Sequence, residues 1–429
     1  MKDAAAPLPP PDPDVDVVSD AAVDDEIVPP PLPSLELSAT APDPVATPDA
    51  LRATIAALRA GTGPVAIDAE RASGYRYGQR CYLVQLRREG AGTFLVDPVP
   101  FGDLSDLGAA IADAQWVLHA ANQDIPSLAE VGLRPRQLFD TEVGARIAGY
   151  ERVGLAAMVE TVLGYSLDKG HSSADWSQRP LTAPLLRYAA LDVEVLIELR
   201  DHLEAVLREQ GKWDWAQQEF AAIAAMPPTP PRVDPWRRTS GIHRLRTRRQ
   251  LATLREMWHH RDEVARRRDI APGRILPDAA LLAAVLAAPT SVEELAALKP
   301  FSGRGTRRNV AEWFAAVARA AALAETELPP IALSGDGPPP AHRWSDRDPV
   351  AAARLARARA AVLEIAADRE LPVENLIEPA VVRRLAWAPP DRANELAVRT
   401  ELRRHGARPW QIDLTAAALA DALTEPLHD

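Results

Sequence analysis

Cysteine is almost absent from this sequence, and long apolar runs are missing altogether. The single cysteine, Cys81, excludes an internal disulfide. Apolar stretches such as AALLAAVLAA at residues 279–288 fall well short of the roughly 20 residues that span a bilayer. The N-terminal residues also lack the apolar core of a signal peptide. The sequence therefore predicts a cytoplasmic protein with no membrane partner, and it gives no sign of an obligate protein partner.

Lysine is also scarce, since four of the 49 basic residues are Lys and the other 45 are Arg. Alanine is abundant as well, which indicates a coding bias, so the Arg excess alone does not indicate phosphate binding. The net charge of -11 comes from the N-terminus: residues 1–50 contain eleven Asp or Glu, one Lys and twelve of the 40 prolines. We therefore predict that residues 1–48 form a disordered acidic tail, and that the rest of the chain is nearly neutral.

Two proline-rich segments divide the remaining sequence. MPPTPPRVDPW at 226–236 and GDGPPPAHRW at 335–344 each interrupt helical patterns, because proline cannot continue a helix interior. Three folded units follow, at 49–226, 240–325 and 345–427.

The first unit has the pattern of an α/β domain. Short apolar runs, GPVAIDAE, RCYLVQLRR, GTFLVDP and WVLHAA, predict three or four strands in succession. Helical patterns follow, ending with one long pattern over residues 184–207. Strands followed by helices predict a mixed sheet covered by helices and not a strictly alternating fold.

The first predicted strand carries two carboxylates one residue apart. Residues i and i+2 of a strand face the same side, so Asp68 and Glu70 converge while Ala69 points away. Two such carboxylates repel unless they are protonated or neutralised by a cation, and hard oxygen ligands suit Mg²⁺ or Mn²⁺. A lone D-x-E is common at the polar end of a strand, so the metal hypothesis needs further carboxylates.

Two further acidic positions have suitable surroundings. Asp124 follows a predicted strand at the start of a helix, where it can cap the helix or reach a site at the strand end. Tyr188 and Asp192 lie four residues apart, on one face of a strongly apolar helix. A charge there is costly without a partner, although an ordinary amphipathic helix is the alternative.

The order of these motifs, with their surrounding words, resembles the ribonuclease D family of the DEDD exonuclease superfamily, in the subgroup with a tyrosine in its third motif. The words that carry the resemblance are IDAE, HAANQD, FDTEVGARIAG, LAAMVETVLGYSLDKGHSSADWSQRPL and YAALDVEVL, within residues 60–207. The resemblance implies a ribonuclease H-like fold and a 3′-to-5′ exonuclease. One departure is Ala69, where family members often have Thr, and the loop after it differs too.

By resemblance, the acidic set takes the family's roles. Asp68 and Glu70 would be the first-motif metal ligands, Asp124 the second and Asp192 the third, with Tyr188 orienting the attacking water. The implied cofactors are two divalent cations, Mg²⁺ or Mn²⁺, and the implied substrate is RNA, with tRNA precursors as the suggested case.

Other residues of this unit carry weaker signals. Tyr75, Arg76 and Tyr77 follow the first motif and either contact the terminal nucleotides or form an ordinary exposed loop. His119 is expected to be a hydrogen-bonding core residue and Cys81 a small buried side chain. His171 lies next to SSADW and is not named as catalytic.

The second unit is locally basic, with thirteen Arg against five Asp or Glu between residues 232 and 274. Such an imbalance favours a nucleic-acid contact over a solvated helix face. The words RDIAPGRILPDAALLAAV and SVEELAAL resemble the HRDC domain. In its KPFSGRGTRRN loop, Lys299, Arg304, Arg307 and Arg308 form a candidate phosphate contact, and clamping of the nuclease domain is the competing interpretation.

The third unit repeats this plan. ADRELPVENLIEPAVVRRLAW is similar to RRRDIAPGRILPDAALLAAV, which predicts an internal duplication and a second, divergent HRDC-like domain. The prediction for the whole chain is a metal-dependent 3′-to-5′ exoribonuclease. A DNA exonuclease with the same chemistry and a catalytically silent RNA-binding protein are the alternatives.

Overall fold

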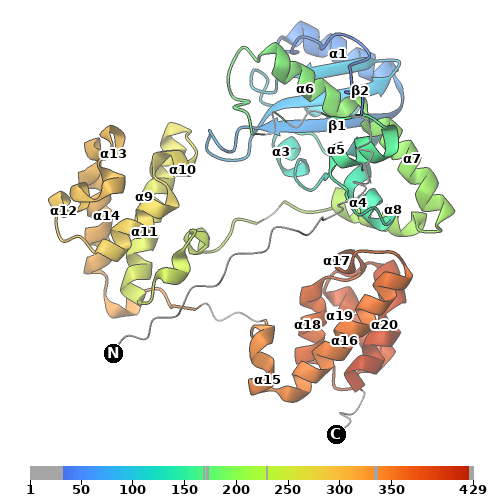
Figure 1. The fold of residues 1–429 in the computed structure, drawn as a ribbon. Helices are drawn as coiled ribbons and strands as arrows, with labels where there is room; N and C mark the ends of the chain where they lie inside the picture. Colours follow the sequence, from blue (N-terminus) through green and yellow to red (C-terminus); the bar gives the residue numbers. More distant parts are fainter. Residues whose placement is uncertain (1–31, 168–169, 171–172, 229, 333–336, 425–429) are drawn as a thin grey trace, which may run out of the picture.

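The chain folds into three units (Figure 1). The structure is a computed structural model, and it describes residues 32–424 except 168–169, 171–172, 229 and 333–336. The first unit combines a sheet with helices, and the other two are helical. Among the described residues, none of the helices has both the length and the apolar character needed to cross a membrane.

The sheet of the first unit is mixed, as predicted. Its five strands lie in the order β3-β2-β1-β4-β5. β1 pairs antiparallel with β2 and parallel with β4, so it lies at the centre of the sheet. The strands are β1 (Thr62–Arg71), β2 (Cys81–Glu89), β3 (Gly92–Val96), β4 (Gln115–Leu118) and β5 (Gln137–Asp140). The strand pattern of the sequence did not indicate β5, which has only four residues.

Helices flank this sheet, and α6 crosses β1, β2 and β3 (Figure 1). The one long helix predicted over 184–207 is two helices, α6 and α7, which meet at Val195. The helices of the unit are α1 (Pro48–Ala60), α2 (Ser105–Ala110), α3 (Ile125–Glu130), α4 (Thr141–Ile147), α5 (Leu155–Met158), α6 (Ala183–Glu194), α7 (Leu196–Glu209) and α8 (Trp213–Ala224).

The prediction of a disordered tail is wrong for residues 32–47, which precede α1. The backbone N–H of Leu35 donates to the carbonyl of Ser166, and Val45 exchanges backbone hydrogen bonds with β3 and the residue after it. Leu35 and Leu37 pack on the core, and Val45 is buried. These apolar side chains anchor a segment whose composition is otherwise polar and proline-rich. Residues 1–31 of the predicted tail lie outside the described residues.

The two helical units share an order of helices. The second contains α9 (Arg248–Arg268), α10 (Pro272–Ile275), α11 (Asp278–Ala287), α12 (Val292–Ala297), α13 (Arg304–Arg308) and α14 (Val310–Ala322). The third contains α15 (Trp344–Arg347), α16 (Pro349–Asp368), α17 (Val373–Leu376), α18 (Pro379–Trp387), α19 (Glu395–Arg404) and α20 (Pro409–Thr424).

The likeness extends to backbone detail. The long helices α9 and α16 are each followed closely by a residue of positive φ, Asp269 at 48° and Glu370 at 49°. A four-residue helix and then a helix of nine or ten residues come next in both units. This common order supports the predicted duplication.

The third unit shares its core with the first. One cluster of buried apolar side chains runs through both units. Trp410 of α20 stacks on Trp215 of α8 with ring centroids 5.2 Å apart, and its indole N–H donates to Glu219. Lys212 and Gly149 meet Glu370 at the same boundary.

The second unit meets the first through the loop between β1 and β2. Arg274 donates to the carbonyl oxygen of Gly74 and lies 4.0 Å from the centre of the Tyr75 ring. The Tyr77 hydroxyl donates to Asp262 and accepts from Arg266. These contacts, with a backbone hydrogen bond from Ala271 to Tyr75, form the loop contact, defined as residues 74–77 against residues 262–274.

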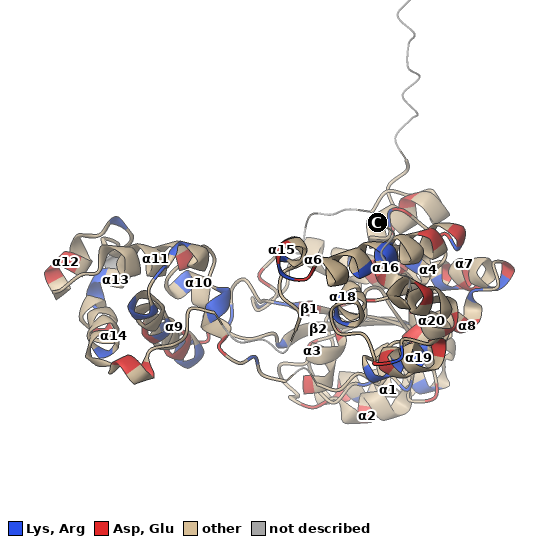
Figure 2. Cartoon of the chain, turned by 90° about the horizontal axis from the view of Figure 1, so that it is seen from below, with Lys and Arg blue, Asp and Glu red and all other residues tan. Residues whose placement is uncertain are grey.

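Several arginines of the second unit form hydrogen bonds and ion pairs within the protein. Arg248 and Arg249 donate to carbonyl oxygens in residues 320–329, and the buried Arg261 pairs with Asp278 at 2.7 Å. In Figure 2, basic and acidic residues are interleaved around α9. The Arg excess of residues 232–274 is therefore in part structural, and the sequence overstated it as a nucleic-acid footprint.

Weakening the loop contact is expected to release the second unit without unfolding it. In a Tyr77→Phe, Arg274→Ala double variant the hydroxyl and guanidinium contacts are lost, while the core around Trp236 and Trp313 is untouched. We expect a larger radius of gyration by small-angle scattering and an unchanged circular dichroism spectrum. Arg399→Ala, which breaks an exposed ion pair within the third unit, is the control. An unchanged radius in the double variant would contradict the assignment.

Candidate metal centre

The central strand brings two carboxylates to one face of the sheet. Asp68 lies opposite Gln85 of β2, and Glu70 lies opposite Leu83, so the alternation predicted for the strand is observed. α6 covers this face and supplies the third carboxylate, that of Asp192. Carboxylate oxygens of Asp68, Glu70 and Asp192 lie within 4.8 Å of one another. Residues far apart in the sequence are therefore joined into one acidic cluster.

Tyr188 belongs to this cluster through the helix spacing that the sequence indicated. It lies one turn before Asp192 on α6, and the Tyr188 hydroxyl hydrogen-bonds to the Asp192 carboxylate. Its ring lies 6.2 Å from that of the buried Trp176. The apolar packing fixes the ring, and the hydroxyl points to the acidic cluster.

Asp124 reaches the same cavity from the start of α3. It occupies the N-cap position, but its side chain makes no capping hydrogen bond, so the capping alternative is wrong. Its carboxylate instead lies 3.4 Å from the guanidinium of Arg71, the residue after the first motif. Arg71 also donates to the carbonyl of Gln123 at 2.6 Å. No pattern in the sequence indicated this cation inside the site.

The acidic residues line an open cavity of about 380 Å³. Its walls are Asp68, Ala69, Glu70, Arg71, His119, Ala120, Gln123, Asp124, Leu155, Tyr188, Asp192 and Leu196. Asp124 and Asp192 are buried, whereas Asp68 and Glu70 are half-buried.

The electrostatics of this cavity favour a cation. Burial, followed by the charges of Asp68, Asp192 and Asp124, raises the pKa of Glu70 to about 10. Burial and neighbouring carboxylates also raise the pKa of Asp124 and Asp192 well above the usual value. Four carboxyl groups cannot all ionise here without a compensating charge. Their hard oxygen donors fit Mg²⁺ or Mn²⁺, which would remove this repulsion.

Asp140 is a structural residue of the site that sequence reasoning missed. It is fully buried at the end of β5 and accepts hydrogen bonds from the backbone N–H groups of Ala120, Ala121, Glu142 and Val143. It thereby joins α4 to the turn that leads into Asp124. Ala120 has a φ of 57°, a left-handed conformation that is costly for a residue with a Cβ. The Asp140 carboxylate stabilises this strained turn beside the cavity.

The remaining sequence candidates have varied positions. His119 hydrogen-bonds to Thr141 at 2.9 Å, and burial lowers its pKa to about 4, as expected of a neutral core histidine. Cys81 is buried and donates to the Leu83 carbonyl. His171 lies outside the described residues.

The residues of the loop after β1 that were predicted to contact nucleotides contact other parts of this chain. Tyr75 and Tyr77 form the loop contact with the second unit, and Arg76 hydrogen-bonds to Ser177 and pairs with Asp269. Arg307 and Arg308 lie exposed on α13, which begins at Arg304, and the side chain of Arg304 lies outside the described part.

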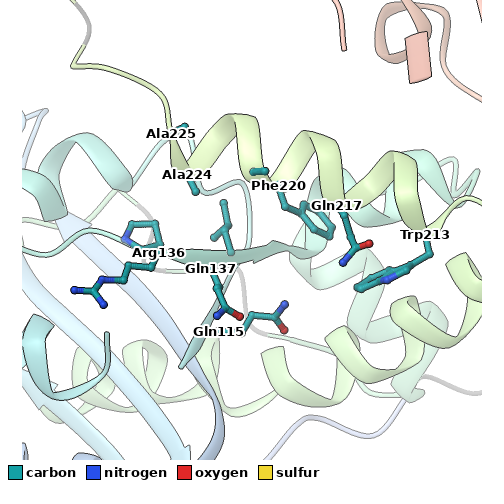
Figure 3. A pocket seen from close by; sticks show the side chains of 11 residues that line it. Gln115, Arg136, Gln137, Trp213, Gln217, Phe220, Ala224 and Ala225 are labelled. Carbon is teal, nitrogen blue, oxygen red and sulfur yellow. The ribbon is translucent and has the colours of Figure 1, made fainter. Parts of the chain in front are cut away.

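A second pocket, of about 430 Å³, lies at the opposite ends of the parallel strands. Gln115 and Gln137 are the first residues of β4 and β5, and Figure 3 shows Gln217 and Trp213 projecting toward them from α8. Of the residues that the structure describes, no carboxylate or histidine lines this pocket. It lacks the groups that hydrolytic chemistry requires.

The chain matches three known family models. Residues 42–208 match a 3′-5′ exonuclease, residues 250–317 the HRDC domain, and residues 337–423 a 3′ to 5′ exonuclease C-terminal domain. The third unit was predicted to be HRDC-like, and the model that it matches is this C-terminal domain.

Individual relatives agree with these models. Ribonuclease D of Gluconacetobacter diazotrophicus is 34% identical over 289 residues, which are 64% of this chain and 71% of that protein. The chain belongs to the ribonuclease D family. It is thus a 3′-5′ exoribonuclease with an exonuclease domain, an HRDC domain and a helical C-terminal region.

Solved structures support the same membership. A crystal structure from Bifidobacterium adolescentis is 37% identical and matches 90% of this chain and 97% of that one, with a TM-score of 0.82. Escherichia coli RNase D, described as an exoribonuclease involved in structured RNA processing, is 27% identical. The match covers 89% of this chain and 98% of that one, with a TM-score of 0.64.

The raised pKa of Glu70 predicts a pH dependence of the metal-free protein. Between pH 4.5 and about 10 the folded state keeps a proton that the unfolded state releases, so the free energy of unfolding falls as pH rises. Gln at position 70 does not titrate, so Glu70→Gln lacks this pH dependence. The free energy of unfolding of the variant, minus that of the wild type, should therefore increase with pH across that window. Urea denaturation at several pH values measures it, and a difference independent of pH would contradict it.

Replacing Asp140 is expected to destabilise the turn that carries Asp124. Asp140→Ala leaves buried N–H groups without an acceptor, at roughly 1–3 kcal/mol for each group that stays unpaired. We expect a loss of at least about 2 kcal/mol in urea denaturation. Ser291→Ala removes an exposed cap of α12 and is the control, with a loss of about 1 kcal/mol. Equal losses would show that the Asp140 carboxylate is an ordinary cap.

Proposed function

We propose that this exoribonuclease shortens structured RNA from the 3′ end, with tRNA precursors as its substrate, in the cytoplasm. The observation that carries the proposal is the convergence of four carboxylates and one tyrosine on a single open cavity. Family membership supports the reaction, and the description of the Escherichia coli relative supports structured RNA as the substrate class.

The ligand set that we propose uses all four carboxylates. Asp68, Glu70 and Asp192 would hold one divalent cation, Mg²⁺ or Mn²⁺, and Asp68 and Asp124 would hold a second. When bound, such ions make a hydroxide available near neutral pH and stabilise negative charge on the leaving 3′ oxygen. Three of the four ligands lie on β1 and α6, which pack against each other, and Asp124 lines the same cavity from the start of α3.

Tyr188 is proposed to orient the attacking water. Burial and the charges of Asp192 and Glu70 raise its pKa above the usual value of 10, so the hydroxyl keeps its proton at neutral pH. A protonated hydroxyl cannot act as the general base. It can hold water in line with the phosphorus while it donates to Asp192.

The surface beyond the cavity supports an RNA path along the second unit. Arg307 and Arg308 are exposed on α13, and Lys299 is exposed just before it. Cations of this kind bind phosphate groups independently of sequence. We propose that they contact the body of the RNA while its 3′ end occupies the cavity.

The first experiment is degradation of a 3′-extended tRNA and of its DNA counterpart, with Mg²⁺ or Mn²⁺ and after chelation. We expect shortening of the RNA from its 3′ end, lost on chelation and in Asp68→Asn, because that change removes the ligand proposed for both ions. Asp113→Asn, at a fully exposed carboxylate, is the matched control and should keep full activity.

The alternatives give different outcomes in the same assay. Equal shortening of the DNA would favour a DNA exonuclease. Binding of the RNA without shortening would favour a silent RNA-binding protein. Full turnover by Asp68→Asn would exclude the proposed ligand set.

A further inference from the structure

Gln85 is an unexplained polar residue at the centre of the first unit. It lies in the middle of β2, and its exposed fraction is 0%. Neither its amide nitrogen nor its amide oxygen has a hydrogen-bond partner among the described residues. Two of its neighbours on this face of the sheet are apolar: Leu83 precedes it by two residues, and Leu95 of β3 lies opposite. The others include Arg87, two residues later on β2, and Asp68 of β1.

Packing does not account for a glutamine at this position. A buried amide without a partner loses its hydrogen bonds to water and gains none in the protein. Leucine or methionine would fill a similar volume without that loss. Buried polar groups that stay unpaired require a separate explanation, and a functional role is one of the few available.

The strand register places Gln85 beside a proposed metal ligand. Gln85 is the residue opposite Asp68 across the β1–β2 pair. Side chains that are opposite in an antiparallel pair lie on the same face, with Cβ atoms about 4.5–5.5 Å apart. α6, which brings Asp192, covers this same face. Of the two residues opposite Gln85, Leu95 is apolar, so Asp68 is the one that can accept from its amide.

Gln85 does not touch the substrate. It is fully buried and does not line the acidic cavity, whose wall is formed by Asp68 itself. Any role in the reaction must therefore act through another residue.

We infer that Gln85 is a positioning residue for Asp68: in the cation-bound protein its amide N–H donates to the Asp68 carboxylate oxygen that faces away from the cavity. The inference rests on the proposed role of Asp68 as a metal ligand. A donor on the outer side of a ligating carboxylate fixes its orientation and favours its ionised form. On this inference the amide lacks a partner in the metal-free protein and gains one when the cation is bound.

The test compares the stability of the metal-free protein with its affinity for metal. In Gln85→Leu the amide is gone but most of the volume remains. We expect the melting temperature of the metal-free protein to rise by about 2–4 °C, since a buried unpaired group has been removed. We expect the affinity for Mn²⁺, measured by calorimetry without RNA, to fall about 10-fold to 100-fold. Gln85→Met, whose side chain is unbranched like that of Gln, repeats the test if the Leu variant folds poorly.

A second buried glutamine supplies the control. Gln411 is 9% exposed, and its amide donates to the Asn375 carbonyl and accepts from the Arg408 backbone. Gln411→Leu breaks both hydrogen bonds, so it should lower the melting temperature and leave Mn²⁺ affinity unchanged.

The outcomes separate this inference from the proposed function. If the wild type binds Mn²⁺ and Asp68→Asn does not, the metal site stands. Equal Mn²⁺ affinity in the Gln85 variants, or a lower melting temperature like that of Gln411→Leu, would then overturn only the role of Gln85. A wild type that binds no Mn²⁺ would overturn both.

Discussion

Mutual repulsion among closely spaced carboxyl groups is the constraint on which the rest of the site depends. Asp68 and Glu70 share one face of a central strand, and Asp192 and Asp124 approach them from two helices. The backbones that carry Asp68, Glu70 and Asp192 are held in place, because β1 is paired on both sides and α6 is packed across three strands. The fold keeps like charges together that would separate in a flexible chain, and a cation is the agent that relieves the repulsion.

The surrounding structure contains devices that stabilise this arrangement. Asp140 satisfies four backbone N–H groups and keeps Ala120 in a left-handed conformation next to the cavity. Arg71 supplies one positive charge to Asp124 from within the site. Ala120 lines the cavity in a left-handed conformation, and Gln85, whose amide has no partner among the described residues, lies opposite Asp68. Such locally unfavourable features are typical of a functional site.

Short-range rules predicted two pairs within the acidic cluster, and the resemblance to the ribonuclease D family joined these pairs with Asp124. The alternation of a strand places Asp68 beside Glu70, and the helical turn places Tyr188 beside Asp192. The mixed sheet followed from the order of strand and helix patterns. Whether these residues bind metal stays a prediction.

What the sequence did not predict depends on contacts between distant segments. Arg71 acts through Asp124, about 50 residues away. Asp140 caps α4 locally, but its hydrogen bonds to Ala120 and Ala121, about 20 residues earlier, have no local signature. Tyr75 and Tyr77 have the composition of a nucleotide contact but lie against the second unit. Leu35 and Val45 lie in a polar, proline-rich stretch, yet their few apolar atoms suffice to anchor it. The composition of a segment reports its average polarity, whereas the packing of a segment against a folded domain depends on individual apolar side chains.

The shared core of the first and third units has a consequence for how the chain folds during synthesis. The second unit lies between them in sequence, and its two ends meet where Arg237 donates to the Pro330 carbonyl. It is therefore an insertion within a larger folding unit. Part of the exonuclease domain's apolar surface, around Trp215, stays uncovered on the ribosome until α20 has been made. The catalytic domain is synthesised early, but its final packing waits for α20.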